Sequence, residues 1–260
     1  MIDANSTTEN FTRRALWAQI DLDAAAHNMR VIRKHVGPDV RIAAVVKANA
    51  YGHGAVELAR VFAENGADCF AVSSLDEGVE LRRYAGITKD IFILGHTDGR
   101  RTEELLAYHI EPAVFNLKNA EYYSEEASRL GQTLQVHIAI DTGMSRVGFL
   151  PREETIEAIK KIASLPRIEI RGIFTHFAAA DEKDKTFTHE QFKRFMWVCT
   201  RLENEGVHIP IRHCCNSAAT LEMPEYHLDM VRPGIIQYGC APSPDVSLEG
   251  FDFRPVMSLR

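Results

Sequence analysis

The first feature that could carry out chemistry is a lysine at the end of an apolar run. Residues 41–46 read RIAAVV, and Lys47 follows directly, within the segment AVVKANAYGHG. A lysine that closes a buried strand is partly desolvated, which lowers its pKa and leaves more free amine to form a Schiff base. A lone lysine in this position could equally extend its charged end into solvent, so its neighbours decide between the two interpretations.

Other polar residues follow the ends of later apolar runs. In parallel barrels the chemistry lies at the carboxyl ends of the strands, where the connecting loops converge. If these runs are strands of one barrel, we expect their terminal residues to meet at one mouth. The residues concerned are Lys47, Tyr51, Asp141, Arg146, His176, Asn216, Ser217 and Arg232.

Two of these strand ends are suited to binding a phosphate group. The loops after the seventh and eighth strands of such barrels frequently bind phosphate, and here they read NSAA and RPGI. Ser217 can donate from its hydroxyl, and Gly234 and Ile235 can offer backbone N–H groups. Ser217 could instead cap the short helix that follows it. A Schiff-base lysine together with a phosphate site suggests pyridoxal 5′-phosphate as the cofactor.

The elements that must position these residues alternate between strand and helix. Eight apolar, β-branched runs are predicted to be strands, and most are followed by an amphipathic stretch. This alternation favours parallel pairing and a (β/α)8 barrel over an open doubly wound sheet. The predicted strands are 41–46, 68–73, 90–95, 111–116, 134–140, 168–176, 211–216 and 229–237.

Two flanks are expected to lie outside this α/β barrel. The segment 15–23 has a strand-like pattern but no obvious pairing partner, and the end of the chain becomes apolar again at PVMSL. We therefore expect a flexible tail at 1–10 and a barrel at 11–240, whose leading strand is 15–23. Residues 241–260 are expected to form a connector and the start of a truncated β-domain.

Composition limits the possible partners and the compartment. The net charge is −6 without a basic cluster, which argues against nucleic acid. No segment is long and apolar enough to span a bilayer, so no membrane association is expected and the cytoplasm is the expected location.

Five scattered cysteines fit a reduced compartment better than a disulfide framework. Cys214 and Cys215 follow His213, but neighbouring strand side chains point to opposite faces and should not converge on a metal ion. No metal site is predicted.

The segment around Lys47 resembles the cofactor-attachment signature of the alanine racemase family. The resemblance extends along nearly the whole chain, because later segments are similar to further blocks of that family in the same order. These segments are DTGMSRVGF, THFAAAD, HCCNSAA and MVRPGIIQYG. The resemblance implies a fold-type III pyridoxal-phosphate enzyme that interconverts L- and D-alanine, supplies D-alanine for peptidoglycan, and forms an obligate head-to-tail dimer.

The resemblance also implies a role for each site residue. Lys47 would hold the cofactor as an internal aldimine and act as the base on one face of the substrate. Arg232 would face the pyridine nitrogen and, because a guanidinium keeps its protons, would leave that nitrogen largely unprotonated. The residues implied to bind the cofactor phosphate are Tyr51, Ser217 and the backbone of Gly234 and Ile235, with Asn216 beside them.

The remaining implied roles concern the substrate and the supporting residues. Arg146 would neutralise the substrate carboxylate and the phenolic oxygen of the cofactor, and His176 would lie near the cofactor ring. His213 behind Arg232, together with Asp141, would support the site. Either histidine could also be a satisfied core residue.

The sequence departs from the family pattern at two places. Many members carry a lysine modified by carbon dioxide where this chain has Ala139, so a water molecule, a chloride ion or another carboxylate is expected beside Arg146. Racemisation also needs a second acid–base group on the opposite face of the α-carbon. In the family this is a tyrosine on a C-terminal β-domain, donated across the dimer, and no tyrosine of this chain lies in a similar segment.

Three alternatives stay open. A racemase for serine or for several small amino acids would share the same barrel residues. A non-catalytic pyridoxal-phosphate carrier of the same fold would need no second base, although such carriers do not usually contain KANAYGHG. A Schiff-base aldolase would share the lysine and the phosphate site without needing the cofactor.

Overall fold

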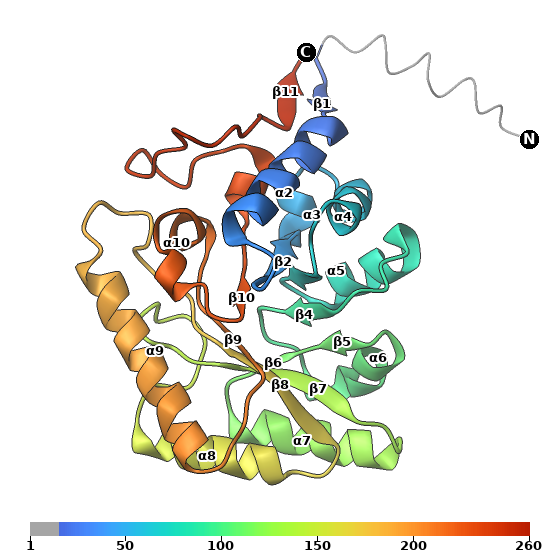
Figure 1. Ribbon diagram of the computed structural model, residues 1–260. Coiled ribbons are helices and arrows are strands. Elements are labelled where there is room, and N and C mark those ends of the chain that lie inside the picture. Colours follow the sequence, from blue (N-terminus) through green and yellow to red (C-terminus); the bar gives the residue numbers. More distant parts are fainter. Residues whose placement is uncertain (1–15) are drawn as a thin grey trace, which may run out of the picture.

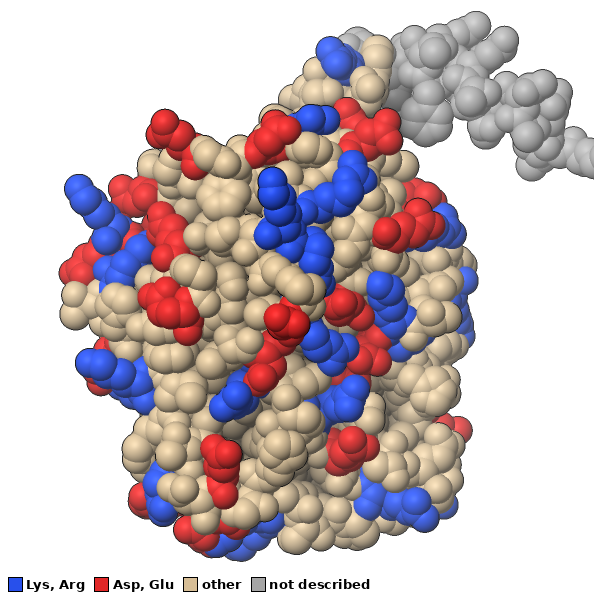
Figure 2. Space-filling model, viewed as in Figure 1, with Lys and Arg blue, Asp and Glu red and all other residues tan. Residues whose placement is uncertain are grey.

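The computed structural model describes residues 16–260 (Figure 1). The predicted tail at 1–10, the predicted start of the barrel at 11 and the first residue of the segment 15–23 lie outside the described residues. No helix within 16–260 is long and apolar enough to cross a membrane. Positive and negative side chains are interspersed over the face shown in Figure 2.

The strands form two parallel sheets that together make the barrel. One sheet has the order β10-β2-β3-β4-β5 and the other the order β6-β7-β8-β9. Backbone hydrogen bonds from Asp229 N to Arg212 O (3.1 Å) and from Arg232 N to Cys215 O (3.0 Å) join the segments around β9 and β10. The bounds are β2 Arg41–Val45, β3 Cys69–Val72, β4 Ile91–Ile93, β5 Ile110–Glu111, β6 Ala113–Val114, β7 Leu134–Ala139, β8 Ile168–Phe174, β9 Ile211–His213 and β10 Met230–Val231.

The predicted α/β barrel is confirmed, with two local differences in its strands. The predicted strand 111–116 is two short strands, β5 and β6, because Pro112 between them has no N–H to donate to a ladder. The predicted strand 229–237 is a strand only at β10. Pro233 follows, and the 3-10 helix η4 (Ile235–Tyr238) replaces the rest.

Most of the helices lie where the amphipathic pattern predicts them. Polar side chains cap several of them; Asn116 Oδ1, for example, accepts from Asn119 N at the start of α7 (2.8 Å). The bounds are α3 Lys47–Tyr51, α4 Ala55–Glu64, α5 Leu75–Glu80 with the π-turn η1 Leu81–Ala85, η2 Gly99–Arg101, α6 Thr102–Ala107, α7 Leu117–Arg129, α8 Glu153–Ser164, α9 Thr186–Asn204, α10 Ser217–Glu222 and η3 Pro224–Tyr226.

The N-terminal segment differs from the prediction in length and in pairing. The strand β1 covers only Ala18–Ile20, because Asp21 caps the helix α2 (Leu22–Val36) by accepting from Ala24 N (2.9 Å). β1 also has a partner, since it pairs antiparallel with β11 (Met257–Leu259) near the C-terminal end (Figure 1). The expectation of an unpaired strand was therefore wrong: two segments from opposite ends of the sequence form this small sheet.

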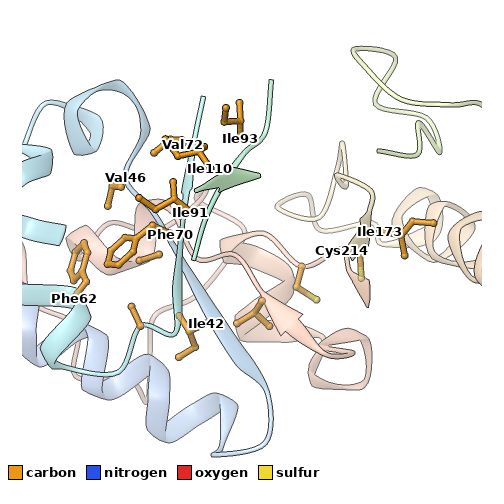
Figure 3. Packing of buried hydrophobic residues seen from close by; sticks show 14 of the residues in the cluster. Ile42, Val46, Phe62, Phe70, Val72, Ile91, Ile93, Ile110, Ile173 and Cys214 are labelled. Carbon is orange, nitrogen blue, oxygen red and sulfur yellow. The ribbon is translucent and has the colours of Figure 1, made fainter. Parts of the chain in front are cut away.

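Side chains alternate between the inside and the outside of the barrel. Along β2, Ile42, Ala44 and Val46 pack in the large core between strands and helices, whereas Ala43 and Val45 belong to a small inner cluster. Figure 3 shows Ile42 and Val46 in this large core together with Phe62 and Phe70. Because strand side chains have a period of two, the residue after Val46 continues the inward set. Lys47 is that residue.

A glycine fixes the turn that follows η4. Gly239 has φ +80°, and a Cβ at this position would lie 2.0 Å from Arg254 O. Gly131 also has a positive φ, +67°, but a Cβ there would meet nothing within 4 Å. The two glycines therefore separate the cost of a left-handed backbone from the cost of a steric clash.

We predict that Gly239→Ala lowers the free energy of unfolding by roughly 2–5 kcal/mol, because strain and overpacking add. Gly131→Ala should lower it by only about 1–2 kcal/mol. Urea denaturation of both variants measures the difference. Equal losses would show that the approach of Arg254 to Gly239 does not constrain the fold.

Candidate active site

Most of the predicted site residues line two adjoining cavities at the carboxyl ends of the strands, whereas Asp141 and His213 line neither of them. The cavities have volumes of about 280 and 240 Å³ and share Lys47, Leu94, Met144 and His176. The first is also lined by Tyr51, Asn216, Ser217, Arg232, Gly234 and Ile235, and the second by Arg146. The structure thus brings predicted site residues that follow five different strands, β2, β7, β8, β9 and β10, to one mouth.

A larger cavity of about 890 Å³ opens at the other end of the barrel, beside the first residues of β5 and β7. None of the predicted site residues lines it. Because loops at the carboxyl ends carry the chemistry of such barrels, we assign the candidate active site to the two smaller cavities.

Lys47 begins a left-handed turn. Ala48, Asn49, Ala50 and Tyr51 have φ values of +51° to +54°, in the region that L-residues other than glycine rarely adopt. Left-handed residues of this kind cost about 1–2 kcal/mol each. Strained backbone persists only where the surrounding structure holds it, and it clusters at functional sites.

The surroundings of this turn include a carboxylate that the sequence reasoning missed. Glu77 accepts from Ala48 N and from Ser73 N, both at 2.7 Å, through its two oxygens. Glu77 lies three residues after Ser74, whose hydroxyl accepts from Glu77 N at the start of α5 (3.4 Å). The Ser-x-x-Glu spacing of a capping box was the available signal, although here the glutamate holds a neighbouring loop as well.

Lys47 is half-buried, and its surroundings lower the pKa of its amine. Burial is the largest cause, and the charges of Arg146 and Arg232 act in the same direction, while Glu77 partly opposes them. An amine with a lowered pKa has a larger unprotonated fraction, which is the form that attacks a carbonyl carbon.

On another side of the first cavity, hydroxyl groups and a glycine backbone lie close together. Ser217 Oγ accepts from Gly234 N at 2.9 Å. A Cβ on Gly234 would lie 2.7 Å from the Tyr51 hydroxyl and 3.8 Å from Ser217 Oγ, so only glycine leaves this space open. Asn216, not Ser217, caps α10 by accepting from Ala219 N, and the Ser217 hydroxyl is therefore directed to the cavity side.

Arg232 is buried, and neutral groups surround its guanidinium. Nη1 donates to His213 Nδ1 (2.9 Å), and Nη2 donates to Thr175 O (2.8 Å) and lies 3.5 Å from His176 Nδ1. Burial lowers the pKa of Arg232 to about 10 and that of His176 to about 3, and the nearby positive charges add to the effect on His176. Burial likewise holds the pKa of His213 well below its usual range. Both histidines are neutral at physiological pH.

The loop that carries Arg146 is ordered by Asp141. Asp141 Oδ1 accepts from Gly143 N (3.0 Å) and Ser145 N (2.9 Å), and Ser145 has a φ of +57°. Asp141 therefore shapes the loop. Arg146 itself lines the second cavity.

The position of the missing lysine is apolar. Ala139 is buried with Ala113 and Phe174 in a small cluster inside the barrel. Among the residues that the structure describes, no carboxylate lines the cavity of Arg146. The expectation of a substitute carboxylate therefore receives no support here.

The two adjacent cysteines converge, contrary to expectation. Cys214 Sγ and Cys215 Sγ lie 3.2 and 3.1 Å from the same acceptor, Tyr226 O. The alternation argument failed because β9 ends at His213, so these two residues no longer belong to a strand. Within 16–260, no group of three His, Cys, Asp or Glu side chains is placed to hold a metal ion.

Tyr51 is the only tyrosine, in the part of the chain that the structure describes, that lines either cavity. Tyr226 lies elsewhere, stacked on Phe192 with ring centroids 3.7 Å apart, and Tyr238 donates to Val45 O beneath the first loop. The described site therefore offers one amine base and no second tyrosine beyond Tyr51.

Comparison with known proteins identifies relatives along the same stretch. The sequence model of a family described as alanine racemase, N-terminal domain, matches residues 20–242. The alanine racemases of Clostridium tetani and Clostridium perfringens are 50% and 49% identical over 95% of this chain and over 63% and 64% of their own lengths. The chain therefore spans less than two thirds of these curated relatives.

A solved structure shows the same fold. The alanine racemase of Clostridium difficile 630 in complex with cycloserine is 40% identical, with a TM-score of 0.92, over 95% of this chain and 68% of that one. The family match covers most of the chain. This chain belongs to the alanine racemase family.

Proposed function

We propose that this chain is the barrel portion of a pyridoxal-phosphate-dependent racemase that interconverts L- and D-alanine. The observation that carries the proposal is the lining of the first cavity, of about 280 Å³. It combines a lysine of lowered pKa, two hydroxyl groups around a required glycine, and a buried guanidinium. The relatives named alanine racemase, at about 50% identity, support the same reaction.

The residues of the mouth fit this cofactor. Lys47 would supply an amine for its aldehyde group, and Tyr51, Ser217 and the backbone of Gly234 and Ile235, which line the same cavity, would supply donors for its phosphate. The open space at Gly234, where a Cβ would meet the Tyr51 hydroxyl, leaves room for phosphate oxygens. When bound, pyridoxal phosphate withdraws electrons from the α-carbon of an amino acid and so acidifies its proton.

Three side chains would then act on the ring and the proton. Lys47 would take the α-proton on one face, which its lowered pKa favours. Arg232 would face the ring nitrogen and leave it unprotonated, since a guanidinium does not readily release a proton. That arrangement would restrain side reactions such as transamination. The neutral His176 lies beside Arg232 and adds no competing charge.

Arg146 would bind the substrate carboxylate and the phenolic oxygen of the cofactor, and Asp141 holds the loop that presents it. Racemisation also needs an acid on the opposite face of the α-carbon. Because the curated relatives are longer than this chain, we propose that a further segment, contributed across a homodimer, supplies that group. The product D-alanine would serve peptidoglycan synthesis, in the cytoplasm.

We predict that Lys47→Ala abolishes the absorbance band that appears when pyridoxal phosphate is added to the protein, because the band needs the lysine amine. Lys118→Ala, which removes an exposed lysine of α7, should leave the band unchanged. Ultraviolet–visible titration measures both. A band that survives in Lys47→Ala would remove the central residue of the proposal.

We also predict that the amine of Lys47 titrates below its ordinary pKa of 10.5 in the cofactor-free protein. Arg146→Gln removes a positive charge that disfavours the protonated form, so the midpoint should rise. Burial remains in that variant, so the midpoint should stay below 10.5. NMR of 13C-methylated lysines follows the titration, with Arg152→Gln as the exposed arginine control. A midpoint at or above 10.5 in the unchanged protein would contradict the electrostatic account.

Exchange of the α-proton separates an enzyme from a cofactor carrier. With cofactor and L-alanine in deuterated water, we expect α-deuterium to appear, and Lys47→Ala should slow this by about 100-fold or more. Proton NMR measures the exchange, and serine in place of alanine tests substrate preference. Cofactor binding without exchange would favour the carrier.

A further inference from the structure

A chain of hydrogen bonds crosses the barrel interior behind the candidate active site. Arg232 Nη1 lies 2.9 Å from His213 Nδ1, and His213 Nε2 lies 3.0 Å from His137 Nδ1. His137 Nε2 in turn lies 2.7 Å from Glu111 Oε2. The four residues come from or directly follow β10, β9, β7 and β5, so the chain connects the mouth to the opposite end, where Glu111 borders the large cavity.

The chemistry of the two ends fixes the direction of every bond. A guanidinium can only donate, so His213 Nδ1 must accept from Arg232 and a neutral His213 carries its proton on Nε2. That proton is donated to His137 Nδ1, and the proton on His137 Nε2 is donated to Glu111. An ionised carboxylate can only accept, so the far end demands the same order.

The hydrogen-bonded chain also joins two buried side chains of opposite charge. Among residues 16–260, Arg232 is the only buried lysine or arginine, and Glu111 is the only buried aspartate or glutamate. The other partners of the Arg232 guanidinium are the carbonyl oxygens of Thr175 and Cys214 and, at 3.5 Å, Nδ1 of the neutral His176, and none of them carries a net charge. A buried charge without compensation is strongly unfavourable.

The core is shaped around the two imidazoles. Phe92 stacks on His137 and Phe174 on His213, with interplanar angles of 13° and 20°. A Cβ on Gly172 would lie 2.4 Å from His137 Nδ1, so this residue of β8 must lack a side chain for the ring to lie in the chain. Packing thus holds both rings at the positions that the hydrogen bonds require.

We propose that Glu111 is the counter-charge of Arg232, transmitted through His137 and His213, and that Glu111 and His137 are positioning residues for the guanidinium. The two neutral imidazoles connect the two charges while Glu111 itself stays outside the mouth. The inference rests on the proposed function only for the role of Arg232 toward the cofactor ring, and its test needs no cofactor.

A double-mutant cycle on the cofactor-free protein tests the charge compensation. Glu111→Gln keeps an oxygen that can accept from His137 but removes the charge, so the equilibrium constant for unfolding should rise by roughly 100-fold or more. In an Arg232→Gln background the uncompensated cation is absent, so Glu111→Gln should raise the equilibrium constant for unfolding by only about 10-fold or less. Equal effects in the two backgrounds would overturn the proposal.

Glu169→Gln is the matched control, because this exposed carboxylate lines the same large cavity but takes no part in the hydrogen bonds that link Glu111 to Arg232. It should change stability little in either background. If Glu111→Gln alone does not fold, the proposal requires the double variant to fold, and a double variant that fails to fold contradicts it.

The 15N chemical shifts of the histidines give a spectroscopic readout that a general loss of packing would not imitate. At pH 8 the unchanged protein should show His137 and His213 neutral and protonated on Nε2. Glu111→Gln should retain both tautomers, because Arg232 still fixes the direction from its end. A proton on Nδ1 of either ring in the unchanged protein would contradict the proposed order.

Discussion

The alternation of side chains along the parallel strands is the constraint on which the site depends. Ala43 and Val45 face the inside of the barrel, and Lys47 continues the same set at the mouth. The same alternation applies to β9 and β10. Ile211 and Met230 belong to the inner cluster, and His213 and Arg232 each follow two residues later on the same side. A slip of one residue in β2 or β10 would exchange the functional side chain for an apolar one.

Positive charge dominates the mouth that this geometry creates. Lys47, Arg146 and Arg232 line the two cavities, and Asp181 is the only acidic residue, among those that the structure describes, that lines either one. Burial lowers the pKa of Lys47 and of His176, and the excess of positive charge adds to both shifts. The same positive charge suits a phosphate-bearing cofactor and a substrate carboxylate. Placing the counter-charge of Arg232 at Glu111, at the far end of a neutral chain, stabilises the cation without adding a negative charge to the mouth.

Much of the barrel could be predicted from sequence, because each buried strand is a short apolar run and the helices repeat their own pattern. The pairing of β1 with β11 could not, since it joins segments from opposite ends of the sequence. Pro112 and Pro233 shortened two strands that hydrophobicity alone extended too far. The family resemblance directed attention to the mouth residues, and the Ser-x-x-Glu spacing was the only local signal for Glu77. Glu111 and His137 act through contacts between strands that no local pattern shows.

The central claim is that Lys47 is the amine that captures the cofactor aldehyde. Reduction of the protein–pyridoxal phosphate mixture with borohydride, followed by peptide mass spectrometry, identifies the modified residue directly. We predict one pyridoxyl group per chain, on the peptide that contains Lys47, in spite of the other lysines on the surface. Modification of a different lysine, or of several to similar extents, would contradict the account.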